Sequence, residues 1–233
     1  MLPKFKKAVA LGTLIAIAGL ASAALADTAA KDKEEAAELF AKARDSYNDL
    51  IKADSPDKGI PREMLEHARA IAVFPKVMNA AVGVGARSGK GVVVARQADG
   101  KWGAPAEFEI KGGSWGAQIG AEATELVLFF MNDESVKSLL SSKFTLGGKA
   151  GLAAGPVGRS AEASTDLKLN AAIYSYAKSK GLFAGISLEG AKMTPDKNDN
   201  AHLYGRPMST EQILFSGKVS PPSSAEPFLS ALP

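Results

Sequence analysis

Two short segments of the chain carry residue types and spacings that could support chemistry. The first, Gly85-Ala-Arg-Ser-Gly89-Lys90-Gly91, has the glycines and the lysine of a phosphate-binding loop. Val84, however, stands where that motif requires its first glycine, and Gly91 stands where a serine or threonine would hold magnesium. The strand, loop and helix context of such a site is also absent. The segment therefore does not predict nucleotide binding.

The second segment is Asp196-x-Asn198-x-Asn200, which copies the opening of a calcium-binding EF-hand loop. Ala201 replaces the turn glycine of that loop, and Pro207 replaces its bidentate glutamate. Half of the calcium ligands are thus missing. We predict a solvated loop here and no metal site.

Other residues that commonly carry catalysis are few or poorly placed. The chain has no cysteine, and its two histidines, His67 and His202, lie far apart with no Asp or Glu at ligand spacing. No serine sits in a Gly-x-Ser-x-Gly elbow. We expect no enzyme and no cofactor. Catalysis by two carboxylates stays open, because such partners meet in space rather than along the chain.

Basic residues are more informative than these fragments. The stretch between His67 and Ala98 has five basic residues and no acid, and the stretch from Ser135 to Ala161 has four and no acid. A charged partner responds to the local electrostatic potential of the surface, so these stretches could attract anionic groups. The alternative is that they are ordinary solvated side chains on the polar faces of strands.

Hydrophobic periodicity predicts the helices and strands that position these residues. Apolar residues at steps of three and four predict an amphipathic helix over 31–52, and a short helix is expected over 62–70. Alternation then predicts strands at 92–97 and 102–110, joined by an Asp99-Gly100 turn, and apolar character predicts one at 126–131. Further strands are expected at 143–157, 169–178 and 182–191, followed by a polar loop, a helix at 209–215 and a flexible tail at 218–233.

Glycine indicates the shape of the sheet. Of the 23 glycines, 18 lie between Gly83 and Gly190, repeatedly inside strand patterns. Glycine weakens a strand, so its repetition indicates sharp bends, bulges or close backbone approach. We predict an α+β fold with a strongly curved, glycine-rich antiparallel sheet, partly closed like a barrel, with flanking helices.

The first 26 residues have the layout of a secretory signal peptide. Three lysines precede an apolar run from Ala8 to Leu20, and Ala24-Leu25-Ala26 is a small-x-small cleavage site. These lysines account for the whole net charge of +3, so the mature chain is formally neutral. We predict a leader at 1–26, a single domain at 27–217, a periplasmic or secreted location, and no transmembrane span after cleavage.

The predicted β region resembles the SYLF lipid-binding domain family. The order and span of the matching stretches, from about residue 36 to 205, make the resemblance specific. These stretches are Ala70–Lys76, Val82–Gly91, Gly112–Ala121, Glu125–Asn132, Lys143–Gly148, Ala153–Arg159, Ile173–Tyr176 and Lys180–Gly190.

The resemblance implies a membrane-binding function, since eukaryotic members are phosphoinositide- and membrane-binding modules, some tied to actin. We expect the chain to bind anionic phospholipid or membrane surfaces without chemistry, and to bind no nucleic acid. Alternatives are an envelope module that meets an acidic protein or polysaccharide and, more remotely, a two-carboxylate hydrolase. The candidate lipid-binding residues are Arg87, Lys90, Trp102, Lys143, Lys149 and Arg159. Trp102 lies beside the predicted turn, whereas Trp115 shares a strand face with Ala117 and Ile119 and is expected in the core.

Overall fold

The computed structural model describes residues 28, 30–51, 60–148, 151–156 and 171–233. The predicted leader, Lys149 and Arg159 lie outside these residues. In chain order the elements are the N-terminal helix (30–51), α2 (Arg62–His67), β1 (Ala70–Ala95), β2 (Ala106–Phe130), α3 (Asp133–Ser138), β3 (Phe144–Thr145), β4 (Leu152–Ala154), β5 (Ile173–Ser179), β6 (Leu182–Gly185), β7 (Lys192–Pro195), α5 (Lys197–Tyr204), α6 (Thr210–Phe215), the 3-10 helix η1 (Ser223–Ala225) and α7 (Glu226–Leu229).

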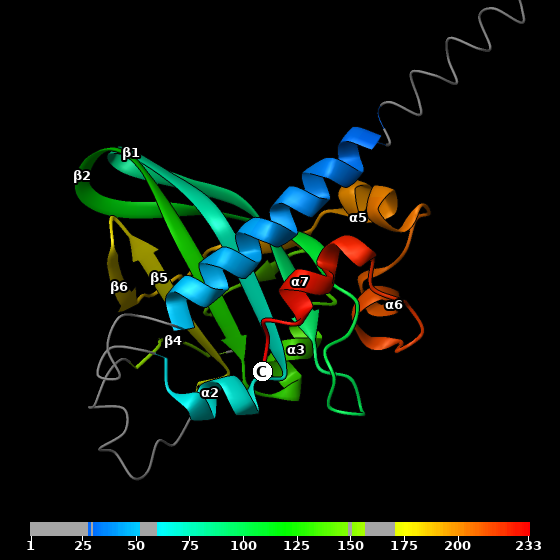
Figure 1. Ribbon diagram of the computed structural model, residues 1–233. Coiled ribbons are helices and arrows are strands. Elements are labelled where there is room, and N and C mark those ends of the chain that lie inside the picture. Colours follow the sequence, from blue (N-terminus) through cyan, green and yellow to red (C-terminus); the bar gives the residue numbers. More distant parts are fainter. Residues whose placement is uncertain (1–27, 29, 52–59, 149–150, 157–170) are drawn as a thin grey trace, which may run out of the picture.

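One long hairpin of β1 and β2 dominates the fold. Its antiparallel pairing runs from Ala70↔Phe130 to Val93↔Ala106, with register shifts at Phe74/Val77 and Val82/Val84. The hairpin bends back on itself (Figure 1), so that the Arg96 N–H donates to the Arg69 carbonyl at 2.8 Å. We call residues 78–86 of β1, with their partners 113–123 of β2, the hairpin bend. The whole sheet curls through 249° into a half-barrel.

Glycine permits this close return of the hairpin, as its distribution predicted. A Cβ at Gly91 would lie 2.5 Å from the Val73 carbonyl oxygen and 2.3 Å from the Phe74 ring. A Cβ at Gly89 would lie 2.5 Å from the Lys76 carbonyl oxygen. Real Cβ atoms do not approach so closely, so a side chain at either position would force the two limbs of β1 apart.

The remaining strands extend the sheet from β2. β5 and β7 pair with different parts of β2, and β6 and β3 pair with β5 and β7, all antiparallel. β4 runs parallel to β5, so the sheet is mixed rather than purely antiparallel. Apart from that one pairing, the predicted α+β fold with a curved, partly closed sheet is confirmed.

The N-terminal helix covers one face of the sheet (Figure 1), as its periodicity predicted. Phe40, Ala43, Tyr47 and Leu50 are fully buried against apolar residues of β1, β2 and β5. Burial of each large side chain stabilises the fold by about 1.5–3 kcal/mol. The opposite face packs a second core, which includes Phe74, Phe108 and Phe130, against α3 and α6. The sheet is therefore covered on both sides.

Other local features of the structure match the predictions from the sequence. In the turn between β1 and β2, the Gly100 N–H donates to the Gln97 carbonyl at 2.9 Å, and Gly100 has φ +82°. Asn132 begins α3 by accepting the Ser135 N–H at 2.9 Å. The predicted helix at 209–215 is α6, which starts with a capping box between Ser209 and Gln212.

Two C-terminal predictions are wrong. The predicted solvated loop at Asp196–Asn200 is the start of α5, because Asp196 accepts the N–H groups of Asn198 and Asp199 as an N-cap. The predicted flexible tail at 218–233 instead forms η1 and α7 and buries Phe228 completely. Its proline and serine content suggested flexibility, but Ala225 and Phe228 are buried in the core under the N-terminal helix, with Leu229, Ala231 and Leu232 packed against it.

Candidate functional site

The structure does not gather the predicted lipid-binding residues on one surface. Lys149 and Arg159 lie outside the described residues. Arg87 and Lys90 both lie on β1, but three residues apart in a strand they point to opposite faces of the sheet. Trp102 lies in the connection between β1 and β2, and Lys143 is exposed just before β3. Each of them therefore has a different environment.

Lys90 is neutralised by acids from the distant helix α5. Its Nζ donates to Asp199 Oδ2 and lies 3.8 Å from Asp196 Oδ2. The hydrogen bond to Asp199 raises the pKa of Lys90, against the opposing effect of partial burial. The sequence around Lys90 is free of acids, but the surface around it is not.

Glu107 lies beside this pair and is only 4% exposed. The Asn200 side chain accepts the Glu107 N–H at 2.8 Å and donates to the Glu107 carbonyl at 2.9 Å. Burial raises the pKa of Glu107 to about 7, helped by Asp199 and opposed by Lys90. Glu107 was not among the candidate residues of the sequence analysis, because its burial depends on the N-terminal helix and α5, which lie far from it in the sequence.

The Trp102 side chain is engaged within the molecule. The Arg96 guanidinium lies 4.3 Å from the centre of its ring, a cation–π contact. The Trp102 Nε1–H donates to the Pro233 carbonyl at 2.8 Å, and Arg96 Nη2 donates to the same oxygen at 3.3 Å. Contact with a bilayer would have to compete with this packing.

Arg87 is half-buried on the other face of β1. Its Nε has no hydrogen-bond partner among the described residues, and burial lowers the pKa of its guanidinium. The Arg87 Cγ lies near Gly112, since a Cβ there would be 3.6 Å from it. An anion could pair with this group only from the side of the sheet away from Lys90.

Lysines that the sequence did not single out meet on the neighbouring strands. Lys111 of β2 and Lys192 of β7 lie directly opposite each other in the register. Lys111 also contacts Glu109 at 2.5 Å, whereas Lys192 is exposed with no ion pair among the described residues. Lys143 precedes β3, whose Thr145 pairs with Lys192. We call Lys111, Lys192 and Lys143 the lysine row.

The lysine row borders the hairpin bend. Lys111 lies where β2 enters the bend, and the charges of Lys111 and Lys192 repel each other across the strands. Directly opposed like charges destabilise a sheet. An anion over the row would relieve this repulsion. Only the strand register reveals the row, so a single sequence could not have predicted it.

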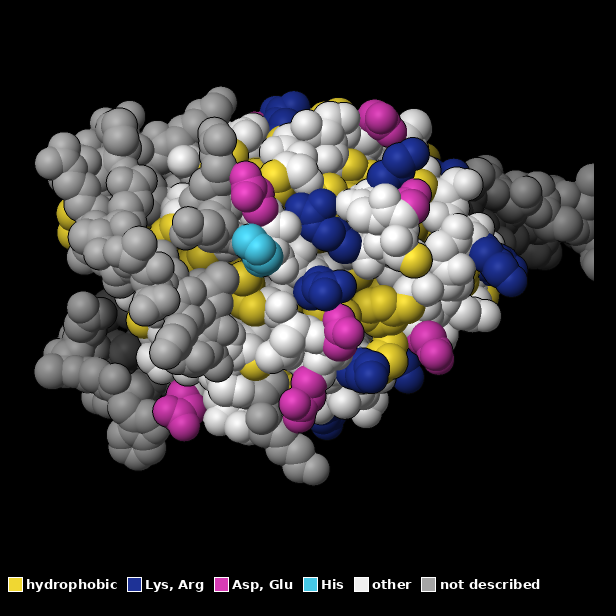
Figure 2. Space-filling model, turned by 90° about the horizontal axis from the view of Figure 1, so that it is seen from below, with side chains coloured by type: hydrophobic (Ala, Val, Ile, Leu, Met, Phe, Trp, Pro, Cys, Tyr) yellow, Lys and Arg dark blue, Asp and Glu magenta, His cyan; other side chains and the backbone are white. Residues whose placement is uncertain are grey.

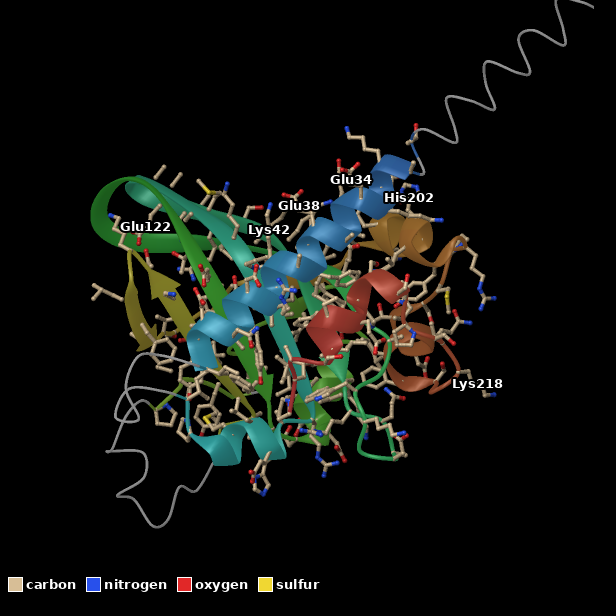
Figure 3. The ribbon with its side chains drawn as sticks, viewed as in Figure 1. Glu34, Glu38, Lys42, Glu122, His202 and Lys218 are labelled. Carbon is tan, nitrogen blue, oxygen red and sulfur yellow. The ribbon has the colours of Figure 1, made fainter. Side chains whose placement is uncertain are left out.

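Apolar side chains are exposed where β2 leaves the same bend. Met78, which pairs with Ala123, is 42% exposed, and Leu182 is 78% exposed. Leu182 follows the Lys180-Gly181 turn between β5 and β6, where Lys180 has φ +48°. Glu122, which pairs with Asn79 within the bend, also lies at this end of the molecule (Figure 3). The described edges of the bend thus offer apolar side chains on one limb and lysines on the other.

The face of the molecule away from the bend is different. Figure 2 shows lysine, arginine, aspartate and glutamate side chains interspersed around the view from below. Exposed charges of opposite sign also pair elsewhere on the surface, since Arg69 lies 3.9 Å from Asp133 with both side chains exposed. No single sign of charge dominates this face, so it offers less to an anionic surface than the lysine row does.

Within the described part of the chain, no three His, Asp or Glu side chains come together as a metal site. No helix in the described ranges is long and apolar enough to span a bilayer.

Comparison with known proteins places these features in a family context. The Ysc84 family model, described as Las17-binding protein actin regulator, matches residues 111–233. SH3 domain-containing YSC84-like protein 1 of Rattus norvegicus is 39% identical over 191 residues, which cover 82% of this chain and 56% of that protein. LAS seventeen-binding protein 3 of Saccharomyces cerevisiae (strain ATCC 204508 / S288c) is 37% identical over 179 residues, 76% of this chain and 39% of that protein. The chain spans about half the length, or less, of these relatives.

Proposed function

Because the chain belongs to the Ysc84 (SYLF) family, a family of actin-regulating and lipid-binding domains, we propose that it binds anionic lipid or membrane surfaces without chemistry. The predicted leader supports an exported protein that meets such a surface in the periplasm or outside the cell. The observation that carries the proposal is the lysine row at the hairpin bend.

The lysine row suits an anionic surface because only one of its three lysines, Lys111, is paired with an acid of the described structure. The exposed Lys143 and Lys192 have no ion pair among the described residues, and Lys192 faces another lysine. Each lysine held near a charged membrane contributes about 1 kcal/mol. Contacts from Lys143 and Lys192, with apolar insertion from Leu182 across the bend, are sufficient for weak, salt-sensitive binding.

Flotation with vesicles tests the proposal. We expect the protein to float with phosphatidylglycerol vesicles and less with phosphatidylcholine vesicles, and the difference should shrink as salt rises. The double variant Lys111→Gln/Lys192→Gln should lose most of the preference for anionic vesicles. Lys101→Gln/Lys137→Gln removes two exposed lysines away from the bend and is the matched control. Equal flotation of wild type and the first variant would contradict the lysine row as the site.

A protein-interaction module of the cell envelope is the second candidate. The relatives named as Las17-binding support it, and so does the position of β6, which pairs only with β5 among the described strands. An extended partner segment could add to that edge by backbone hydrogen bonds. Failure of the wild type to bind either vesicle type would favour this candidate.

A two-carboxylate hydrolase has one observation in its favour, the buried Glu107 with its raised pKa. The other carboxylates near it are occupied, however, since Lys90 contacts both Asp196 and Asp199. A hydrolase needs a second carboxylate that is free to act on water or substrate. We therefore propose that Glu107 serves binding rather than hydrolysis.

A further inference from the structure

A cleft of about 400 Å³ lies between the N-terminal helix, β1, β2 and α5. Its walls carry charges of both signs, including Lys42, Lys76, Lys90, Glu107 and Asp199. Figure 3 shows Glu38 and Lys42 along the helix and His202 near its first turns. Phosphate-binding and metal-binding sites are usually lined by one sign of charge, so this mixture indicates a different kind of ligand.

Most of the charged groups in the cleft already have partners. Lys90 contacts Asp199, and Lys42 contacts Glu38 at 2.5 Å. The His202 Nδ1 lies 3.0 Å from Asp32 Oδ2, and Glu35 lies 3.8 Å from Lys31. Two of these pairs lie within the N-terminal helix, Lys90–Asp199 joins β1 to α5, and His202–Asp32 joins α5 to the N-terminal helix. They are not available to a ligand without loss of a contact.

Two charged groups in the cleft have no such partner in the described structure. The Glu107 carboxyl makes no hydrogen bond or ion pair there, although the residue is 4% exposed. The exposed Lys76 ammonium also has no ion pair there, and it is not within ion-pair distance of Glu107. Neither oxygen of the Glu107 carboxyl is among the fully buried side-chain atoms that lack a hydrogen-bond partner, so the carboxyl opens into the cleft and a ligand there can reach it. Lys76 and Glu107 thus present one positive and one negative group to the same cavity.

We propose that this cleft binds a small zwitterion, whose ammonium group pairs with Glu107 and whose phosphate or carboxylate pairs with Lys76. The same chemistry is found in the headgroup of an ethanolamine phospholipid and in free amino phosphates. The lipid source rests on the proposed membrane function, whereas the free source does not. The cleft has room for such a headgroup beside the paired residues.

Glu107 couples this binding to pH. The ionisable groups that face it are Lys90 from β1, Asp196, Asp199 and Tyr204 at α5, and Glu35 from the N-terminal helix, and Lys76 and His202 line the same cleft. With the pKa of Glu107 raised to about 7, an entering ammonium must displace a proton at acidic pH. The affinity should fall about tenfold for each pH unit below 7 and change little above 8.

Titration calorimetry with glycerophosphoethanolamine tests the site, because the charges of this soluble headgroup stay constant over that pH range. We expect the full chain to bind it at pH 8, with ethanolamine and glycerol phosphate each at least about tenfold weaker. Glu107→Gln and Lys76→Gln should each weaken binding by about tenfold or more. Absence of heat at about 10 mM ligand, or unchanged affinity in Glu107→Gln, would overturn the proposal.

Two matched controls separate the site from general effects. Glu109→Gln changes the next outward-facing carboxylate of β2, which pairs with Lys111 outside the cleft, and should bind like wild type. Lys101→Gln changes an exposed lysine of the turn and should do the same. Glu107→Gln keeps the side-chain shape, and a melting curve checks that it folds. If this variant does not fold, the pH dependence of headgroup binding to the wild type still tests the proposal. An affinity that does not change from pH 5 to 8 would overturn it.

Vesicles distinguish the two sources of the zwitterion. If the lipid headgroup is the ligand, phosphatidylethanolamine added to phosphatidylcholine vesicles should recruit wild type but not Glu107→Gln. Binding of the soluble headgroup without such recruitment keeps the site and assigns it to a free zwitterion. Binding to anionic vesicles without any headgroup binding would overturn this inference and leave the proposed function intact.

Discussion

Lys90 and Lys192 lie on strands of the same sheet and differ in what the chain places around them. Lys90 lies in an acid-free stretch of sequence, yet α5 brings Asp196 and Asp199 to it. Lys192 lies in a stretch with acids close by in sequence, yet the register sets it opposite Lys111. Local sequence thus misjudges both surfaces. The charge that a partner meets depends on strand pairing and on which helix covers the strand.

The largest expected effect is at Glu107, which lies beside Lys90 on the surface that α5 covers. Its pKa is about 7 in the folded protein against an ordinary value of 4.5, so the fold binds the proton more tightly than the unfolded chain does. This contribution to stability is present below pH 4.5 and lost as pH rises to about 7, a change of about 3 kcal/mol. Denaturant unfolding at several pH values should show this loss in wild type and in Glu109→Gln, but not in Glu107→Gln. A slope that persists in Glu107→Gln would show that another group causes it.

The second-largest effect is expected at the exposed lysine row, when the charge of one of its lysines is reversed. Lys192→Glu should weaken binding to anionic vesicles by roughly 2 kcal/mol at low salt, because the local charge changes by two units. The new carboxylate faces Lys111, so the free energy of unfolding should stay level or rise by about 0.2–1 kcal/mol. Flotation and denaturant unfolding measure the two quantities. Lys137→Glu, an equal reversal on α3, should leave flotation unchanged, and equal losses in both variants would count against the row.

The third effect concerns the apolar limb of the bend. Leu182→Ser should weaken vesicle binding by about 1 kcal/mol with little change in stability, since the side chain is mostly in solvent. Leu140→Ser is the control, because Leu140 is also partly exposed, at 41%, but follows α3. A Leu182→Trp variant gives a direct signal, a blue shift of fluorescence on addition of vesicles. No shift, with binding retained, would place the contact elsewhere.

The smallest effect is at Lys90 itself. Lys90→Gln should lower the free energy of unfolding by about 0.5–1 kcal/mol, because the ion pair is half-exposed and screened by water. Binding to anionic vesicles should be unchanged, since the charge of Lys90 is already neutralised. Denaturant unfolding and flotation together decide, and a loss of flotation in the folded variant would restore Lys90 to the lipid site.

The sequence predicted those parts of the fold that depend on local signals. Periodicity predicted the N-terminal helix, and Asp99-Gly100 predicted the turn between β1 and β2. Glycines predicted the close return of β1, which Gly89 and Gly91 permit. In each case a few neighbouring residues determine the backbone, so the pattern is readable without knowledge of distant contacts.

Long-range pairing limited the prediction of the site. The opposition of Lys111 and Lys192 depends on a register between β2 and β7, and the burial of Glu107 depends on α5 and the N-terminal helix. The tail at 218–233 is composed like a flexible segment, but the buried Ala225 and Phe228 and the hydrogen bonds to Pro233 hold it. Composition averages over residues, whereas a few contacts are sufficient to order a segment.

The tight turn between β1 and β2 also has a consequence for the order in which the chain folds. Gln97 and Gly100 close a loop of a few residues, and every later pair of the hairpin forms next to one already made. Pairing can therefore propagate from the turn with little further entropy of loop closure at each step. The contact between Arg69 and Arg96 joins the two ends of β1, so it forms only after the ribbon has paired and curled. We expect this closure to be the slow step of folding and docking of the N-terminal helix to follow it, in which case Gly100→Ala should slow refolding while Phe40→Ala mainly speeds unfolding.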